Sequence, residues 1–228
     1  MEKINVLLTG ASRGIGLATC QLLLSENNLN ADIIIVSRES PDEFKDHKNV
    51  FYYKCDLSSS TETEKVIGDI LARHDHIDVL INNAGAGTFA NAEDIALPDW
   101  ERLLSLNLTT PFLFVKYFLP GMKKTGRGRI INITSDADHI AYAGASLYCA
   151  TKYGLRGFSE ALRKELIGLN ISVTTIAPGR VDTHFNRKKP GDRPISLRPS
   201  DVAKQILHVI LQDEKCEIET IYLKSNLE

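Results

Sequence analysis

Short runs of apolar, largely β-branched residues alternate along the chain with longer segments that have helical hydrophobic spacing. The apolar runs predict strands at residues 4–8, 32–37, 50–55, 79–82, 129–134, 172–176 and 219–223. The segments between them predict helices near residues 15–26, 61–73, 99–122, 146–168 and 200–212. Strands that are apolar on both faces are typical of parallel sheets covered by helices. The pattern therefore predicts a doubly wound α/β fold, with a mainly parallel seven-stranded sheet and helices on both faces.

Two stretches, residues 86–97 and 180–198, fit neither pattern, and both follow predicted strands. In an open α/β sheet, ligands bind beyond the carboxyl ends of the strands, so these stretches are expected to form substrate loops. Pro111 falls inside the third predicted helix and should kink it. Neither a linker nor a repeat divides the sequence, which predicts one domain over residues 1–228.

The junction between the first predicted strand and the first predicted helix, residues 9–16, reads TGASRGIG. Glycine permits a tight turn and close backbone approach, and the unpaired amides at the start of a helix attract phosphate groups. The same glycines would also suit a packed strand-to-helix turn without a ligand, so the junction alone leaves both interpretations open. We expect a dinucleotide pyrophosphate to lie against Gly10, Ser12, Arg13, Gly14, Ile15 and Gly16.

Further short motifs accompany this TGxxxGxG spacing: NNAG at residues 82–85, Ser135, YCATK at residues 148–152, and PG at residues 178–179. Together, in this order and at these intervals, they resemble the short-chain dehydrogenase/reductase family over essentially the whole chain. The resemblance implies a Rossmann-type dinucleotide-binding oxidoreductase domain with a nicotinamide cofactor.

Tyr148 and Lys152 are four residues apart in a predicted helix, so their side chains should lie on one face about a turn apart. A nearby ammonium stabilises a phenolate and lowers the pKa of tyrosine, which makes Tyr148 a candidate general acid or base. A surface tyrosine and lysine on an amphipathic helix would show the same spacing. The accompanying motifs favour the catalytic interpretation.

The resemblance also implies roles for residues outside this pair. Ser135 would hydrogen-bond the substrate oxygen, and Lys152 would also contact the nicotinamide ribose. Asn107 would hold a water for proton relay, although a helix-packing amide would fit the same position. The remaining implied contacts are to adenosine and adenine by Asn83, Ala84, Gly85, Asp56 and Leu57, and to the nicotinamide end by Tyr148, Pro178, Gly179, Val181 and Thr183.

The end of the second predicted strand determines the expected cofactor. An acidic residue there would bind the ribose 2′-hydroxyl of NAD and repel a 2′-phosphate. The chain has Ser37 and Arg38 instead, and Arg13 could approach the same phosphate. Glu39 follows directly, and we expect it to point away. The sequence therefore predicts NADP(H) over NAD(H).

The expected reaction is reversible, NADPH-dependent reduction of a small or medium-sized carbonyl compound, with Tyr148 as general acid and base. Asp136, Asp138 and His139 are more polar than the small residues that the family often has after Ser135, which argues against a wholly apolar ketone. The candidate aromatic walls are Phe89, Tyr142, His184 and Phe185. The alternative is a non-catalytic NADP(H)-binding sensor or scaffold protein.

Charge and cysteine content limit the partners. The chain has 27 basic and 29 acidic residues, which predicts no nucleic-acid or membrane partner. Four widely spaced cysteines and the absence of a signal or spanning pattern indicate reduced thiols and a cytoplasmic protein. Histidines and aspartates at residues 74–78 are too close together to favour a metal site. The helices at 99–122 and 146–168 commonly pair between subunits in the family, which implies a homodimer or homotetramer.

Overall fold

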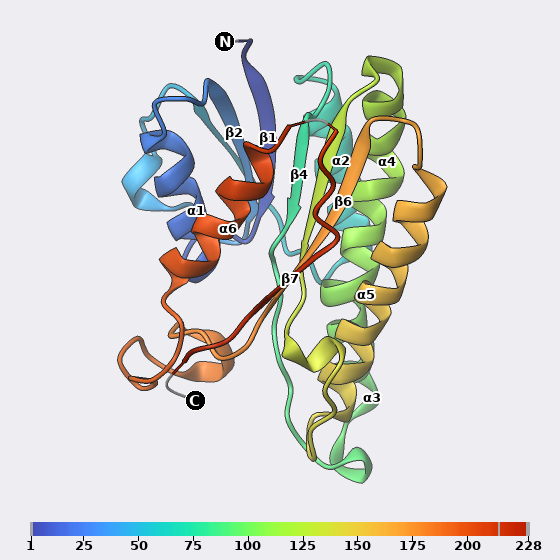
Figure 1. The fold of residues 1–228 in the computed structure, drawn as a ribbon. Coiled ribbons are helices and arrows are strands. Elements are labelled where there is room, and N and C mark those ends of the chain that lie inside the picture. The colour runs from blue at the N-terminus through green and yellow to red at the C-terminus, as the bar shows by residue number, and fades with distance from the viewer. Residues whose placement is uncertain (1, 214, 227–228) are drawn as a thin grey trace.

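The computed structural model describes residues 2–213 and 215–226, and its strands form one parallel sheet (Figure 1). The strand order is β3-β2-β1-β4-β5-β6-β7, and each neighbouring pair is parallel. This confirms the predicted fold class, and each strand lies within two residues of its predicted limits. The strands are β1 (Ile4–Thr9), β2 (Ala31–Ser37), β3 (Val50–Lys54), β4 (Val79–Asn82), β5 (Gly128–Ile133), β6 (Ile171–Pro178) and β7 (Thr220–Leu223).

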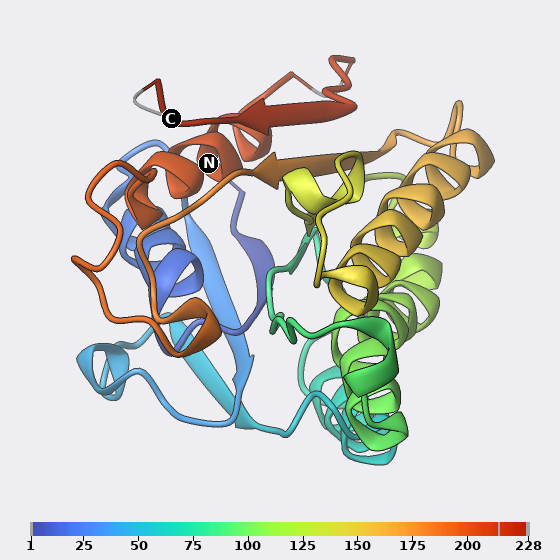
Figure 2. The ribbon, with the colours of Figure 1, turned by 90° about the horizontal axis from the view of Figure 1, so that it is seen from below.

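Helices cover both faces of the sheet (Figures 1 and 2). Helices α1 (Gly14–Ser25) and α6 (Pro199–Ile210) pack against one face, whereas α2 (Ser60–Leu71), α4 (Thr110–Thr125) and α5 (Ser146–Glu165) pack against the other. Short 3₁₀ turns lie at Asp42–Phe44, Ala92–Asp94, Asp136–Asp138 and Phe185–Arg187. In the part of the chain that the structure describes, no helix has both the length and the apolarity needed to cross a membrane.

Alternate side chains of the central strands enter two separate cores. Leu7 of β1 lies in the core beneath α2, α4 and α5, while its neighbours Val6 and Leu8 lie in the core beneath α1 and α6. Successive residues of a strand point to opposite faces, so a strand buried on both sides must be apolar at every position. This explains the continuous apolar runs in the sequence.

The third predicted helix, residues 99–122, consists of three segments. Helix α3 (Leu97–Leu104) leads into a π-helical turn (Ser105–Thr109), and α4 follows. Pro111 has no N–H to return to the carbonyl four residues earlier, and the N–H of Thr110 reaches back five residues to the Ser105 carbonyl. The predicted helix therefore contains a π turn directly before Pro111, the residue expected to kink it.

The carboxyl ends of the strands meet at one edge of the sheet. Figure 2 looks onto this edge, where the green loop after β4 and the orange loop after β6 lie across the strand ends. Between β1 and β4 the strand order changes direction, and the helices that follow these two strands, α1 after β1 and α4 after β4, cover opposite faces of the sheet. Such a switch point leaves an opening above the strands, which is where ligands bind in open α/β sheets.

Candidate active site

A cleft of about 740 Å³ opens at this switch point. Its walls come from the turn between β1 and α1, from the ends of β2 and β3, and from the loops that follow β4 and β6. Most of the predicted cofactor residues line it: Gly10, Ser12, Arg13, Gly14, Ile15, Ser37, Arg38, Asp56, Leu57, Asn83, Ala84, Gly85 and Thr183.

The glycines of the turn meet specific backbone constraints. Gly10 has a positive φ of 74°, and a Cβ atom there would lie 2.9 Å from the Ala84 Cα. A Cβ atom on Gly16 would lie 2.2 Å from the Gly10 carbonyl oxygen, which no real structure tolerates. The turn therefore packs against the segment after β4 with no space for side chains. Its free amides and the start of α1 face the cleft, which suits a pyrophosphate.

A cluster of hydrogen bonds fixes this turn to the end of β4. The Thr9 hydroxyl oxygen accepts from the backbone N–H groups of Asn83 and Ala84, each at 3.0 Å. The Asn83 amide donates to the carbonyl oxygens of Thr9 and Gly10, at 2.8 and 3.0 Å. Asn83 thus holds the turn as well as lining the cleft. Thr9 was not among the predicted site residues, although it is the first residue of the TGxxxGxG motif.

The far end of the cleft, where the sequence places adenosine, carries both signs of charge. Arg38, Glu39 and Asp56 line it together with Arg102 of α3, which sequence reasoning missed. Hydrogen bonds from Ser58 lower the pKa of Asp56, and the charges of Arg38 and Arg102 add to this effect. Glu39 lines the cleft as well, and its backbone carbonyl accepts the Ser37 hydroxyl at 2.8 Å. The expectation that its side chain points away stays a prediction.

Tyr148 and Lys152 lie on one face of α5, both buried. The Lys152 Nζ is 5.8 Å from the centre of the Tyr148 ring and donates to the Ile133 carbonyl at 3.0 Å. Their spacing predicts that the ammonium lowers the pKa of the tyrosine, but the structure gives the opposite direction. Burial raises the pKa of Tyr148, a hydrogen bond with Ser135 opposes the rise, and the charge of Asp136 adds to it. Burial therefore favours the neutral phenol at Tyr148.

Burial also acts on the lysine. It lowers the pKa of Lys152 to about 8, and the negative charge of Asp138 opposes that shift. The Asp138 side chain is fully buried and accepts hydrogen bonds from Thr134 and His139, each at 2.6 Å. Asp138 was predicted only as a polar residue near the substrate. Its contacts place it behind the site, as a carboxylate that supports the charge of Lys152.

Ser135 begins the segment after β5 and has its hydroxyl in a chain of polar contacts. Its Oγ donates to Asp136 at 2.8 Å and accepts from the backbone N–H of Ala137 at 3.3 Å. Ser135 also acts on the Tyr148 hydroxyl, where it lowers the pKa of the phenol. The single O–H of Ser135 is used by Asp136 in this structure, so it would have to turn from Asp136 to donate to a substrate oxygen.

Asn107 lies in the π-helical turn and is 1% exposed. Its amide nitrogen donates to the Ala86 carbonyl at 2.9 Å and to the Thr151 hydroxyl at 3.0 Å, and its oxygen accepts from the Ala86 N–H at 3.1 Å. The side chain therefore ties the loop after β4 to α5, next to Tyr148. A proton-relay role for Asn107 stays a prediction.

The segment after β6 joins the cofactor end of the cleft to Tyr148. Val181 forms a β-bridge with Leu197, and the Gly179 N–H donates to the Leu223 carbonyl at 2.8 Å. The predicted cofactor residues Pro178, Gly179 and Val181 are not among the described residues that line the cleft. The segment brings Thr183 against the glycine turn: a Cβ atom added to Gly14 would lie 3.3 Å from the Thr183 Cγ2.

None of the four predicted catalytic residues is among the described residues that line the cleft, but two phenylalanines of the cleft wall contact Tyr148. The rings of Phe89 and Phe185 lie 5.4 and 5.6 Å from that of Tyr148. The expected substrate loops thus meet over Tyr148.

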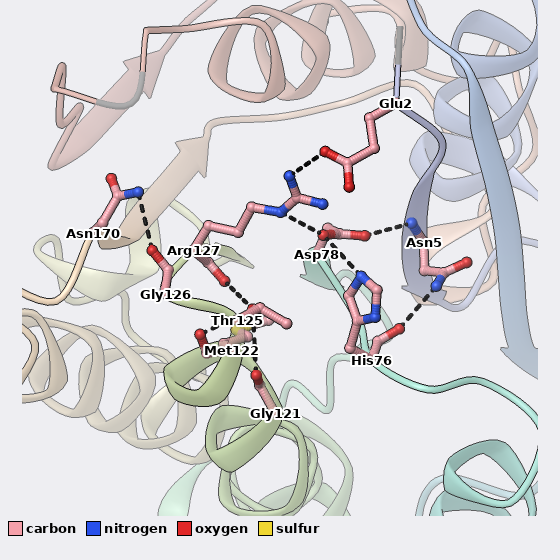
Figure 3. A network of polar contacts seen from close by, with 10 residues as sticks. All are labelled: Glu2, Asn5, His76, Asp78, Gly121, Met122, Thr125, Gly126, Arg127 and Asn170. Atoms are coloured by element: carbon pink, nitrogen blue, oxygen red, sulfur yellow. Dashed lines mark hydrogen bonds and ion pairs between the residues drawn. The ribbon is translucent and has the colours of Figure 1, made fainter.

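The histidines and aspartates at residues 74–78 lie near the amino ends of the strands and do not converge. His76 and Arg127 both contact Asp78, at 3.3 and 3.2 Å, and Arg127 also pairs with Glu2 (Figure 3). His74 contacts the Tyr53 hydroxyl instead. Among the residues that the structure describes, no group of three or more histidine, cysteine, aspartate or glutamate side chains could hold a metal ion.

Comparison with protein families gives a match consistent with this geometry. A family model described as short chain dehydrogenase matches residues 4–194, which include the glycine turn, Ser135, Tyr148 and Lys152. The chain belongs to the short-chain dehydrogenase family.

Relatives of this short-chain dehydrogenase match over nearly its whole length. An uncharacterized oxidoreductase of Staphylococcus saprophyticus is 31% identical over 96% of this chain and 94% of its own. An NADP-dependent 3-hydroxy acid dehydrogenase of Escherichia coli O6:H1 is 30% identical over 95% of this chain and 92% of its own. The solved structure of a serine dehydrogenase complexed with NADP+ has a TM-score of 0.87 and 30% identity, covering 97% of this chain and 94% of that one.

Proposed function

We propose that this short-chain dehydrogenase is an NADPH-dependent oxidoreductase that reversibly reduces the carbonyl group of a small or medium-sized compound to an alcohol. The observation that carries the proposal is the group of buried side chains Ser135, Tyr148 and Lys152, with the Tyr148 ring against two phenylalanines that line the cleft around the glycine turn. When bound, NADPH supplies a hydride to the carbonyl carbon.

The protein's own residues would handle the oxygen and the proton. Ser135 would donate a hydrogen bond to the substrate oxygen and so fix the carbonyl beside Tyr148. Tyr148, whose pKa is raised by burial, would donate its proton as negative charge develops on that oxygen. Lys152 would then stabilise the phenolate that remains, and in the reverse reaction this phenolate would accept the proton of the alcohol.

The proposed cofactor preference rests on Arg13 and Arg38, both of which line the cleft. A guanidinium fits a phosphate in both charge and geometry, so the two side chains would hold a 2′-phosphate that NADH lacks. The NADP+ complex of the serine dehydrogenase and the NADP dependence named for the Escherichia coli relative support this choice.

NADPH oxidation across a panel of ketones and aldehydes tests the proposal. Tyr148→Phe should lower kcat by about 100- to 10,000-fold while the Kd for NADPH stays within about twofold of the wild type. Tyr153→Phe is the matched control, because Tyr153 lies on the same helix but is exposed. Cofactor binding without turnover of any carbonyl would instead favour a non-catalytic NADP(H) sensor or scaffold.

We also propose that residues 1–228 act as one catalytic domain within a homodimer or homotetramer that pairs through α4 and α5. The exposed aromatic ring of Phe112 on α4, which packs edge-on against Phe158 of α5, supports such a contact. The four unpaired cysteines support a cytoplasmic location. Light scattering of the purified protein would give the number of subunits.

A further inference from the structure

A carboxylate stands directly beside the residue proposed to hold the substrate oxygen. Asp136 accepts the Ser135 hydroxyl on Oδ1 and the Tyr142 hydroxyl on Oδ2, both at 2.8 Å. Asp136 is half-buried and Tyr142 is exposed, so these contacts run from the buried site to its outer rim. Each carboxylate oxygen has a second lone pair and can accept another donor.

The charge of Asp136 has no cationic partner in the protein. Within residues 2–213 and 215–226, it takes part in none of the ion pairs that the structure contains. Asp138, two residues on, is instead buried against His139. The field of Asp136 reaches the Tyr148 hydroxyl, where it raises the pKa of the phenol. An unpaired negative charge therefore lies close to the reacting oxygen.

Aromatic rings also lie against Tyr148. Phe89 comes from the loop after β4 and Phe185 from the segment after β6, and their ring centres are 6.4 Å apart, edge to face. Both rings also contact Tyr148. Aromatic faces attract cations, and the carboxylate of Asp136, whose charge acts on the same tyrosine, adds direct charge pairing. This combination suits a positively charged nitrogen better than a carboxylate or an alkyl group.

We propose that the substrate carries a cationic nitrogen, such as a primary ammonium, on the carbon next to the carbonyl, and that Asp136 binds this nitrogen. The inference rests on the proposed carbonyl reduction. The carbonyl carbon gains the hydride, its oxygen gains the Tyr148 proton, and the ammonium is unchanged. A carboxylate on the same carbon would meet Asp136 with like charge, so simple 3-oxo acids should be poor substrates.

Three ketones that differ only at that carbon test the inference: aminoacetone, butanone and acetoacetate, which carry an ammonium, a methyl and a carboxylate group. The assay is run at a pH low enough to keep the amine protonated. For the wild type, kcat/KM should be at least about tenfold higher for aminoacetone than for butanone, and lowest for acetoacetate. Asp136→Asn should remove the aminoacetone preference, measured within that variant as the ratio of kcat/KM for aminoacetone over butanone, so that any change in the common rate cancels.

Glu160→Gln is the control for the loss of one negative charge. Glu160 lies on α5, is exposed and pairs with Arg156 at 2.7 Å, so it is outside the cleft. This variant should keep the wild-type order of the three ketones. An equal loss of the preference in Glu160→Gln would show that net charge, not contact with Asp136, sets the order, and would overturn the inference.

Binding to the NADP+ complex separates this inference from the proposed reaction, because a ketone and the oxidised cofactor form a dead-end pair. Calorimetry should show aminoacetone binding at least about tenfold more tightly than butanone, and only when Asp136 is present. If aminoacetone binds in this way but no carbonyl compound is reduced, the proposed reaction is wrong and the proposed recognition of the cationic nitrogen by Asp136 is supported. Tighter binding or faster reduction of acetoacetate, or an unchanged order in Asp136→Asn, would overturn the recognition and leave the reaction intact.

Discussion

Gly16→Ala should disrupt the glycine turn from within. The new Cβ atom would lie 2.2 Å from the Gly10 carbonyl oxygen, 2.7 Å from the Asn83 Nδ2 and 2.9 Å from the Ala11 Cα. Two of these neighbours are backbone atoms, so the start of α1 would have to move by about 1 Å to restore normal contact distances. Overpacking typically costs about 1–3 kcal/mol, and a clash with backbone should lie at the upper end of this range.

The expected outcome is a free energy of unfolding lower by about 3 kcal/mol and an NADPH affinity at least about tenfold weaker, since the displaced amides are those that face the pyrophosphate. Urea unfolding and a fluorescence titration with NADPH measure the two effects. Gly68→Ala is the matched control: a Cβ atom on Gly68 has no neighbour within 4 Å, and alanine should stabilise α2 by about 0.5–1 kcal/mol. Wild-type affinity and stability in Gly16→Ala would refute the reasoning.

Three further predictions follow from single contacts. Arg38→Asp should shift the ratio of kcat/KM for NADPH over NADH toward NADH by at least about tenfold, and an unchanged ratio would show that Arg38 does not read the 2′-phosphate. The pKa of Lys152 falls from its usual 10.5 to about 8 on folding, so the unfolded chain binds more protons between these values and stability rises with pH there. Relative to Lys152→Met, the wild-type free energy of unfolding should therefore gain about 2 kcal/mol from pH 8 to pH ~10, as urea titrations at each pH would show. Thr9→Val should cost about 2–4 kcal/mol, because it leaves the N–H groups of Asn83 and Ala84 without their acceptor; a loss below about 1 kcal/mol in urea unfolding would contradict this.

The sheet could be predicted from the sequence because burial on two faces leaves a clear pattern. The run from Ile33 to Val36 is fully buried, and a segment of this length that is apolar at every position suits a central parallel strand. The glycine turn could be predicted for a related reason: Gly10 and Gly16 leave no space for a side chain. Where the backbone conformation or its close packing requires glycine, the position of that glycine can be predicted from the sequence alone.

Other features depend on tertiary contacts that the pattern does not contain. A π turn adds one residue to a helical turn without changing which residues are apolar, so the segment 105–109 looks like ordinary helix. Arg102 of α3 lines the cofactor cleft because of the place of α3 in the folded protein, which no local pattern of residues indicates. The direction of the Tyr148 pKa shift depends on burial, which outweighs the influence of Lys152 expected from their spacing.

The same distinction explains why family membership leaves the substrate open. The fold constrains Ser135, because this residue follows β5 closely and its side chain caps the short helix Asp136–Asp138. Among the described residues, the Asp136 carboxylate accepts only from the hydroxyl groups of Ser135 and Tyr142. A half-buried charge that lacks a cationic partner carries a cost of burial. A ligand of opposite charge would offset that cost, and this is the physical reason to look for the substrate's identity at Asp136 rather than in the motifs that define the family.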